Sequence, residues 1–155
     1  MNNEKTISNE DLRLAIKYYN VASMHLQQQN LEQSTVYYHK ALEELNTLGV
    51  ENHKFNVILN ESLGDVYTLL KSYENAAIHY SDALQIGVNV YGESTECVNI
   101  SIKLSDTLQR MELFNEAFSC LCKTYEVLEN IHGEGSEEAN KIMDKLYTLR
   151  DKTTF

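Results

Sequence analysis

The stretch SYENAAIHYSDALQIG, residues 72–87, decides the fold, because large and small side chains alternate along it at helical spacing. Tyr73 is followed three residues later by Ala76, and Tyr80 and Ala83 continue the pattern. The same order of large and small residues occurs in LEQSTVYYHKAL, residues 31–42, and in FNEAFSCLCKTY, residues 114–125. Aligned on their small residue, the three stretches lie 42 and 41 residues apart. The chain is therefore predicted to contain three repeats.

Small residues also recur at three equivalent stations of every repeat, two in the second helix and one in the helix before it. The nine positions are Ala22, Ser34, Ala41, Gly64, Ala76, Ala83, Ser105, Ala117 and Thr124. Two antiparallel helices approach to about 8 Å only where a small side chain lies at the crossing. Each repeat is thus expected to be a helical hairpin, and one hairpin cannot bury its apolar face without a neighbour. The absence of proline and the low glycine count of six also favour long helices.

Residues 62–84, SLGDVYTLLKSYENAAIHYSDAL, resemble a tetratricopeptide repeat (TPR). Its Leu-Gly-x-x-x-Tyr pattern is matched at Leu63, Gly64 and Tyr67, and its Tyr-x-x-Ala pattern at Tyr73 and Ala76. The first repeat matches less well and has His25 at the Tyr67 station, where a core or half-buried side chain is expected. The third matches least. This resemblance implies an all-α, right-handed solenoid of three hairpins with a C-terminal capping helix, seven helices in all.

The repeats depart from the common 34-residue form, which ends its second helix with a proline. Asn46, Val88 and Glu129 occupy the proline position, so each second helix is expected to continue for another turn or two. Long repeats of this kind resemble those of kinesin light chains.

The chain is predicted to form a flexible N-terminus over residues 1–8 and a single domain over residues 9–152. The repeats are placed at about 10–48, 52–90 and 93–131, and the capping helix at 136–151. A capping box of Ser8 and Asp11 predicts that the first helix starts near residue 9. Each inter-repeat loop has a glycine suited to end a helix, and the N-cap candidates are Asn52, Ser94 and Ser136.

The composition of the 155 residues excludes several classes of function. The formal net charge is −10, with 13 scattered Lys and Arg residues, so nucleic acid and anionic membranes are not expected partners. No apolar run is long enough to cross a membrane and no secretory signal begins the chain, so a cytoplasmic location is predicted. A partner is expected to be a protein or peptide, basic or polar in character.

No constellation typical of an enzyme is present, and neither a cofactor nor a metal is expected. Cys120 and Cys122 are two residues apart, and on one helix they point about 200° apart, so they cannot share a metal ion. We expect them, with Cys97, to be small packing residues, and no two of the five histidines are spaced as a helical metal pair.

The resemblance implies that the first helices of the hairpins line a concave binding groove. Residues predicted to line it by helical spacing are Tyr19, Asn20, Ser23, Glu61, Asp65, Asn99, Lys103 and Asp106. The carboxylate clamp by which some TPR domains bind acidic chaperone tails is not carried over, because Tyr19 and Ser23 occupy its first Lys and Asn stations. Glu61, Asp65 and Asp106 suggest instead a groove for a basic or polar segment, although they could equally be solvated residues without a partner.

The predicted function is that of a non-catalytic adaptor that binds a partner through the concave face. One alternative is a structural subunit of a larger assembly that docks by its convex face or its ends, or that self-associates. Exposed apolar residues on the second helices would favour this. Another alternative is a peptide-sensing regulator, a class that usually carries an output domain for which this chain has no room.

Overall fold

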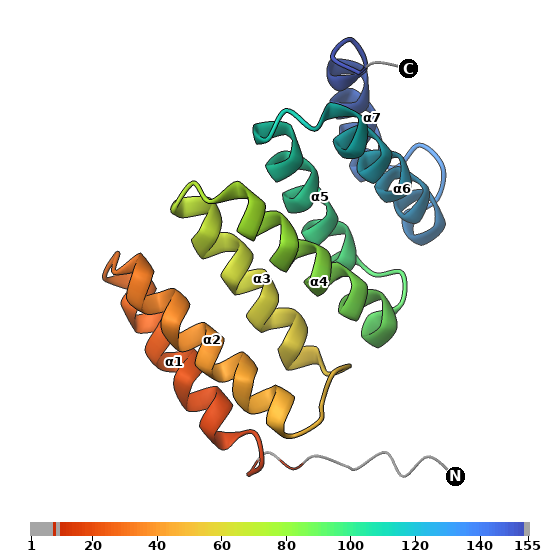
Figure 1. The fold of residues 1–155 in the computed structure, drawn as a ribbon. Helices are drawn as coiled ribbons and strands as arrows, with labels where there is room; N and C mark the ends of the chain where they lie inside the picture. Colours follow the sequence, from red (N-terminus) through yellow and green to blue (C-terminus); the bar gives the residue numbers. More distant parts are fainter. Residues whose placement is uncertain (1–7, 9, 154–155) are drawn as a thin grey trace.

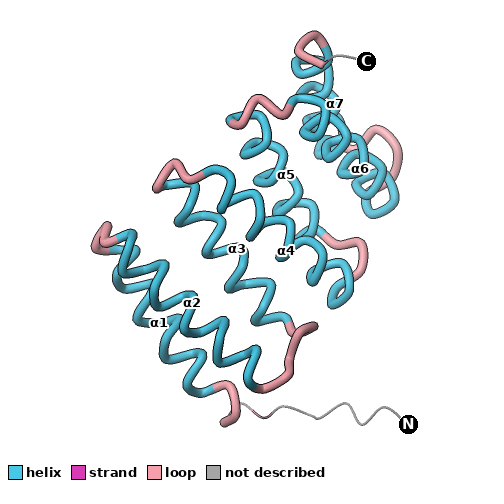
Figure 2. The backbone as a smooth tube through the Cα atoms, viewed as in Figure 1, coloured by secondary structure: helices cyan, strands magenta, loops and turns pink. Residues whose placement is uncertain are grey.

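A computed structural model describes residue 8 and residues 10–153, and these form seven α-helices joined by short loops (Figures 1 and 2). The helices are α1 (Arg13–Gln27), α2 (Leu31–Thr47), α3 (Lys54–Leu69), α4 (Tyr73–Tyr91), α5 (Thr95–Arg110), α6 (Phe114–His132) and α7 (Glu137–Arg150). We call α1, α3 and α5 the A helices and α2, α4 and α6 the B helices. Each A helix pairs with the B helix that follows it.

The helices pack in chain order, so that each one contacts the helix before it and the helix after it (Figure 1). The buried core is accordingly divided into three sections along the solenoid. One lies among α1, α2 and α3, a second among α3, α4 and α5, and a third among α5, α6 and α7. Ala139, Ile142, Leu146 and Leu149 of α7 close the third section. The expectation of an all-α repeat fold with a capping helix is therefore confirmed.

All nine small stations are buried, as hairpin packing requires. Gly64 shows how close the approach is, because a Cβ atom built on it would lie 2.5 Å from the ring of Tyr80. Where a serine occupies a station, its hydroxyl donates to the backbone of the paired helix. Ser34 Oγ donates to the Ala22 carbonyl at 3.0 Å, and Ser105 Oγ donates to the Ala117 carbonyl at 3.3 Å. The polar stations are thus satisfied without water.

The turn inside each hairpin contains one residue in the left-handed region, and none of the three is a glycine. They are Gln29, Lys71 and Glu112, with φ of 60°, 58° and 61°. In the second hairpin the Ser72 amide donates to the Tyr67 carbonyl and the Lys71 amide to the Thr68 carbonyl, which is the Schellman pattern. The loops between hairpins use glycine instead, at Gly49, Gly92 and Gly133, as expected.

The structure corrects two details of the predicted helix ends. His53, not Asn52, caps α3, because its Nδ1 accepts from the Phe55 amide at 3.1 Å. Ser94 and Ser136 do cap α5 and α7. The B helices continue past Asn46, Val88 and Glu129, but by only one to three residues, less than the expected turn or two.

The start of the first helix is corrected as well. The predicted capping box is present, since the Ser8 amide donates to the Asp11 carboxylate at 2.9 Å and the Asp11 amide donates to Ser8 Oγ at 3.2 Å. It precedes a turn at residues 10–12, however, and α1 itself begins at Arg13. The predicted start near residue 9 and residues 1–7 of the predicted flexible N-terminus (1–8) lie outside the described residues.

Across residues 8 and 10–153, no helix combines the length and the apolar character that crossing a membrane would require.

Candidate functional site

Side chains on neighbouring A helices contact one another in register, and α7 takes the place of a fourth A helix. Tyr19 on α1 meets Phe55 on α3 edge-on, with ring centroids 5.6 Å apart. Lys103 on α5 binds carboxylates of α3, and Lys145 on α7 binds Asp106 on α5 at 2.9 Å. These contacts join the four helices into one continuous surface, which we call the A-helix face.

Two of the predicted site residues are held in place by tyrosines of the B helices. The Tyr38 hydroxyl lies 3.1 Å from Ser23 Oγ, and the Tyr80 hydroxyl donates to Asp65 Oδ1 at 2.7 Å. Tyr38 and Tyr80 occupy the same station of successive repeats, as do Ser23 and Asp65. Both tyrosine rings are buried, so each hydroxyl passes between the helices of its own hairpin and fixes a polar group on the A-helix face.

Lys103 is the centre of an ion-pair cluster that joins α3 to α5. Its Nζ lies 2.8 Å from Glu61 Oε1 and 2.9 and 3.0 Å from the two carboxylate oxygens of Asp65. Burial alone would lower the pKa of Lys103, but the hydrogen bonds that Nζ donates to Asp65 and Glu61, together with their negative charge, outweigh burial, and the pKa is raised. Lys103 is therefore charged at neutral pH and balances one of the two carboxylates.

The remaining predicted residues are divided between packing and solvent. Tyr19 is half-buried against Tyr38 and Phe55, whereas Asn20 and Asn99 are exposed. Asp106 is exposed and paired with Lys145. The predicted acidic residues are therefore present on one face, but Glu61 and Asp65 share one lysine and Asp106 has another.

Three residues of this site were missed by the sequence analysis, namely Tyr38, Tyr80 and Lys145. Tyr38 and Tyr80 are buried packing residues, but their hydroxyls also reach the A-helix face. Their station four residues after a small residue could have indicated this role. Lys145 lies in the segment predicted as the capping helix, and nothing in the local sequence indicates that it pairs with Asp106.

Apolar side chains are also exposed on the A helices and α7. Ile58 is 39% exposed, Leu69 58% and Tyr147 61%. The face therefore offers hydroxyls, amides, compensated charges and a few apolar contacts.

The described residues give no support to a metal or redox centre. No group of three or more His, Cys, Asp or Glu side chains among them could hold a metal ion, and all three cysteines are free thiols. Cys120 Sγ lies 3.2 Å from Ser101 Oγ, and burial raises the pKa of its thiol. His25 is half-buried and stacks on Tyr37 with centroids 5.3 Å apart, so it is a packing residue as predicted.

Comparison with known proteins agrees with this geometry. The fold and its regular A-helix face define a helical-repeat protein of the kind that generally serves protein–protein interaction. The family model described as tetratricopeptide repeat matches residues 54–130, and the chain is a tetratricopeptide repeat protein. No curated protein sequence matches the chain.

Two solved structures share the fold at low sequence identity. The crystal structure of BtubC (BKLC) from P. vanneervenii is 16% identical, with a TM-score of 0.77, over 90% of this chain and 56% of that one. This chain thus spans little more than half of that protein. The N-terminal domain of stress-induced protein-1 (STI-1) from C. elegans is 14% identical, with a TM-score of 0.73, over 92% of this chain and 99% of that one. No enzyme family matches, and the TPR fold is typically non-catalytic.

Proposed function

We propose that this protein is a cytoplasmic, non-catalytic adaptor that binds a peptide segment of a partner protein on its A-helix face, the concave face in TPR proteins. The observation that carries the proposal is the continuous row of polar groups on the A helices, held in fixed positions. Ser23 and Asp65 are fixed by tyrosines, and Asp65 also binds Lys103. Groups held in this way lose little conformational freedom when a ligand binds.

The chemistry of the face indicates a polar segment with apolar side chains as the ligand. Lys103 already balances much of the charge of Glu61 and Asp65, so a basic segment finds less negative potential there than the sequence suggests. Exposed Asn20 and Asn99 can hydrogen-bond an extended backbone, and Ile58 and Leu69 can receive apolar side chains.

The proposal is tested by placing a bulky charge on this face and on the opposite one. Ser62→Arg and Asn99→Arg on the A helices should abolish capture of the partner in an affinity purification followed by mass spectrometry. Ser81→Arg, at an exposed position of α4, is the matched control and should capture the same partner as the wild-type chain. Loss of the partner only in the Ser81→Arg variant would reject the A-helix face. Thermal melts of all three variants identify any that fail to fold.

The alternative of a structural subunit that docks by its B helices is favoured by one observation. Ile78 and Val88 of α4 are 56% and 50% exposed. Beside Ile78 an open groove of about 580 Å³ lies between α4, α5 and the turn before α6, lined by Ala77, Leu104, Leu108, Met111 and Leu113. Ile78→Glu should then abolish self-association or assembly in analytical ultracentrifugation, whereas the adaptor proposal expects no change in mass.

A further inference from the structure

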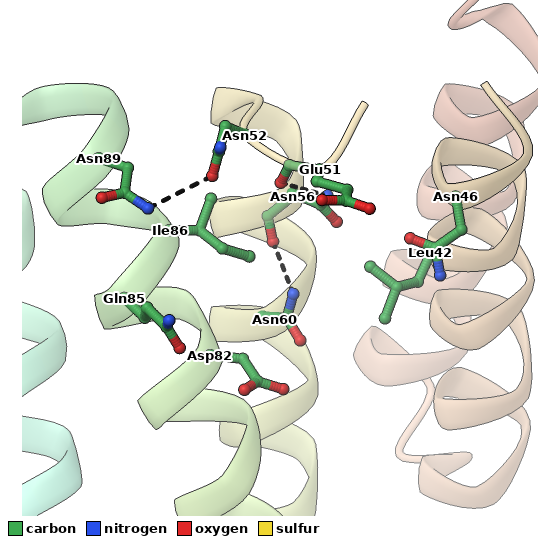
Figure 3. A pocket seen from close by; sticks show the side chains of 10 residues that line it. All are labelled: Leu42, Asn46, Glu51, Asn52, Asn56, Asn60, Asp82, Gln85, Ile86 and Asn89. Carbon is green, nitrogen blue, oxygen red and sulfur yellow. Dashed lines mark hydrogen bonds between the residues drawn. The ribbon is translucent and has the colours of Figure 1, made fainter. Parts of the chain in front are cut away.

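A second polar site lies on the opposite side of the molecule from the A-helix face, in a cleft of about 360 Å³ between α2 and α4, over α3 (Figure 3). Ten residues line it: Leu42, Asn46, Glu51, Asn52, Asn56, Asn60, Asp82, Gln85, Ile86 and Asn89. Five are asparagines and two are acidic, and no Lys or Arg is among them. The cleft is therefore rich in hydrogen-bond acceptors and has negative charge.

Asn56 at the floor of the cleft has a buried acceptor with no partner. The residue is 3% exposed, and its Oδ1 makes no hydrogen bond within the described chain. The amide cannot rotate to exchange its oxygen and nitrogen, because Nδ2 donates to the carbonyls of Val50 at 2.9 Å and Glu51 at 3.0 Å. The Asn56 amide lies on the side of α3 that faces Leu42 and Asn46 of α2 (Figure 3). A buried acceptor without a donor costs about 1–3 kcal/mol, so a donor that enters the cleft is favoured.

The side-chain amide of Asn60, one turn further along α3, is also held by two hydrogen bonds. Its Nδ2 donates to the Asn56 carbonyl at 3.0 Å, and its Oδ1 lies 2.9 Å from His79 Nδ1. The floor of the cleft is thus an ordered pair of amides. Two apolar side chains, Leu42 on α2 and Ile86 on α4, flank this floor on opposite sides (Figure 3).

The next repeat forms the same kind of interface with different residues at four of these stations. The next hairpin interface has an equivalent pocket of about 240 Å³ between α4 and α6, over α5. Shifted by one repeat, Asn46 corresponds to Val88, Asn56 to Cys97, Asn60 to Ser101 and Asp82 to Lys123. The same scaffold therefore accepts a valine, a cysteine, a serine and a lysine at these four stations, whereas the Glu51 carboxylate is retained as Glu93. The three amides and Asp82 are thus particular to the first cleft.

We propose that the cleft between α2 and α4 binds the side chain of an arginine from a partner protein. A guanidinium offers five N–H donors in a plane, which suits a site of converging amide and carboxylate oxygens. Asn56 Oδ1 receives one donor at the floor, and Glu51 and Asp82 supply the opposite charge at the rim. Leu42 and Ile86 pack against the methylene stem. Lysine has a compact ammonium and cannot reach the separated acceptors at the same time.

The charges around the cleft agree with this ligand. Partial burial raises the pKa of the Asp82 carboxyl, so a cation beside it is stabilising. The negative charge that the sequence suggested for a basic partner is compensated in part by Lys103 and Lys145 on the A-helix face, whereas no Lys or Arg lines this cleft. This inference goes beyond the proposed function and does not depend on it, because the cleft and the A-helix face use different side chains, although α3 contributes to both.

The test is a titration of the isotope-labelled protein with Nα-acetyl-arginine methylamide, followed by the backbone and side-chain amide signals in NMR spectra. Saturable shifts are expected at Asn46, Asn56 and Asn60. The citrulline counterpart, which has nearly the same shape without the charge, and the lysine counterpart should each bind about tenfold more weakly, the equivalent of one charged hydrogen bond. Equal shifts with citrulline would overturn the proposal.

The matched variants are two charge changes on one helix. Asp82→Lys introduces the residue type that the next repeat has at this station, and it should weaken arginine binding by about tenfold or more. Glu74→Lys lies two turns earlier on α4, outside the cleft, and should leave the binding unchanged. Equal weakening by both would show nonspecific attraction to an acidic surface and would reject the site. Asn99→Arg on the A-helix face should not affect the titration, which separates this result from the fate of the proposed function.

Discussion

At the scale of single residues, the first two repeats each have a histidine stacked on a tyrosine at the same pair of stations, but the two residue types have changed places. His25 on α1 stacks on Tyr37 on α2, and one repeat later Tyr67 on α3 stacks on His79 on α4, with an interplanar angle of 5°. The histidine and the tyrosine have thus changed helices while the stack is kept. What the hairpin requires at this point is a pair of flat rings.

Gly64 is the residue at which the hairpin packing is closest, and it supports a first prediction. Gly64→Ala should destabilise the protein by about 1–2 kcal/mol, although alanine is the better helix former by up to about 1 kcal/mol. The reason is that the new Cβ overlaps the Tyr80 ring, which Asp65 and Thr68 hold by its hydroxyl. The measurement is urea denaturation.

A second substitution provides the control. Leu121 occupies the Tyr80 station in the third repeat, where Ser105 carries a Cβ at the station of Gly64. In a Tyr80→Leu background, Gly64→Ala should therefore cost nothing or be stabilising. An equal cost in both backgrounds would show that the Tyr80 ring is not the obstacle.

His79 makes the stability depend on pH. Burial, with a smaller contribution from the neighbouring His39, lowers its pKa from the ordinary 6.5 to about 4. Between these two values the unfolded chain binds the proton and the folded chain does not, so stability is complete above pH 6.5 and falls as the pH drops towards 4. Because the ring is part exposed, we expect a loss of about 1 kcal/mol from about pH 7 to about pH 5.

This prediction is measured by the urea midpoint as a function of pH. His79→Gln should flatten the curve, whereas His132→Gln, at an exposed position at the end of α6, should leave it as in the wild type. If the urea midpoint of the His79→Gln variant falls with pH as it does in the wild type, the acid sensitivity belongs to other groups. One such group is His39, whose pKa is also lowered by burial.

At the scale of the elements, the turns inside the hairpins place non-glycine residues in the left-handed backbone conformation, which reduces the stability of the fold. Lys71 has a φ of 58°, a conformation that costs an L-residue about 1–2 kcal/mol and glycine almost nothing. After the greater flexibility of glycine in the unfolded chain is subtracted, Lys71→Gly should stabilise the protein by about 0.5–1 kcal/mol in thermal or urea unfolding.

The matched control for this change is a lysine in an ordinary helical conformation. Lys123→Gly, in the interior of α6, should destabilise by up to about 1 kcal/mol. A loss of stability in both variants would mean that the Lys71 side chain contributes to the turn.

The sequence predicted the hairpins well, because their packing depends on small residues at fixed spacing within about 20 residues of chain. It could not predict what depends on the rotation of one helix against a distant one. The bond from Lys103 to Glu61 joins residues 42 positions apart, and no local pattern distinguishes it from a solvated lysine. The cleft around Asn56 and Asp82 draws on two helices besides α3, and it was not recognised for the same reason.

At the scale of the whole molecule, the division of the core into three sections predicts that unfolding is local. Leu146 on α7 belongs to the third section only, and Leu45 on α2 to the first only. Leu146→Ala should cost about 2–4 kcal/mol and should raise hydrogen exchange in α5, α6 and α7 more than in α1 and α2. Leu45→Ala should give the reverse order. Uniform acceleration along the chain in either variant would show that the three sections unfold as one unit.

Two tyrosines of the second hairpin contact residues at both proposed binding sites. Tyr80 binds Asp65 on the A-helix face, and Tyr67 binds His39 at 3.0 Å and stacks on His79, beside the floor of the cleft. Both tyrosines belong to the second hairpin. This hairpin is therefore the part of the solenoid on which both proposed sites depend.

The ion-pair cluster on the A-helix face also weakens the binding of basic ligands to Glu61 and Asp65. Lys103 is a cation tethered to the same rigid scaffold as Glu61 and Asp65, so its effective concentration at these carboxylates exceeds that of any free segment. A lysine or arginine of a ligand gains little binding free energy there, because it must displace Lys103, which is covalently part of the same chain. Basic peptides of low specificity are therefore disfavoured at this cluster. A ligand that binds the A-helix face must gain its affinity from other residues of the face.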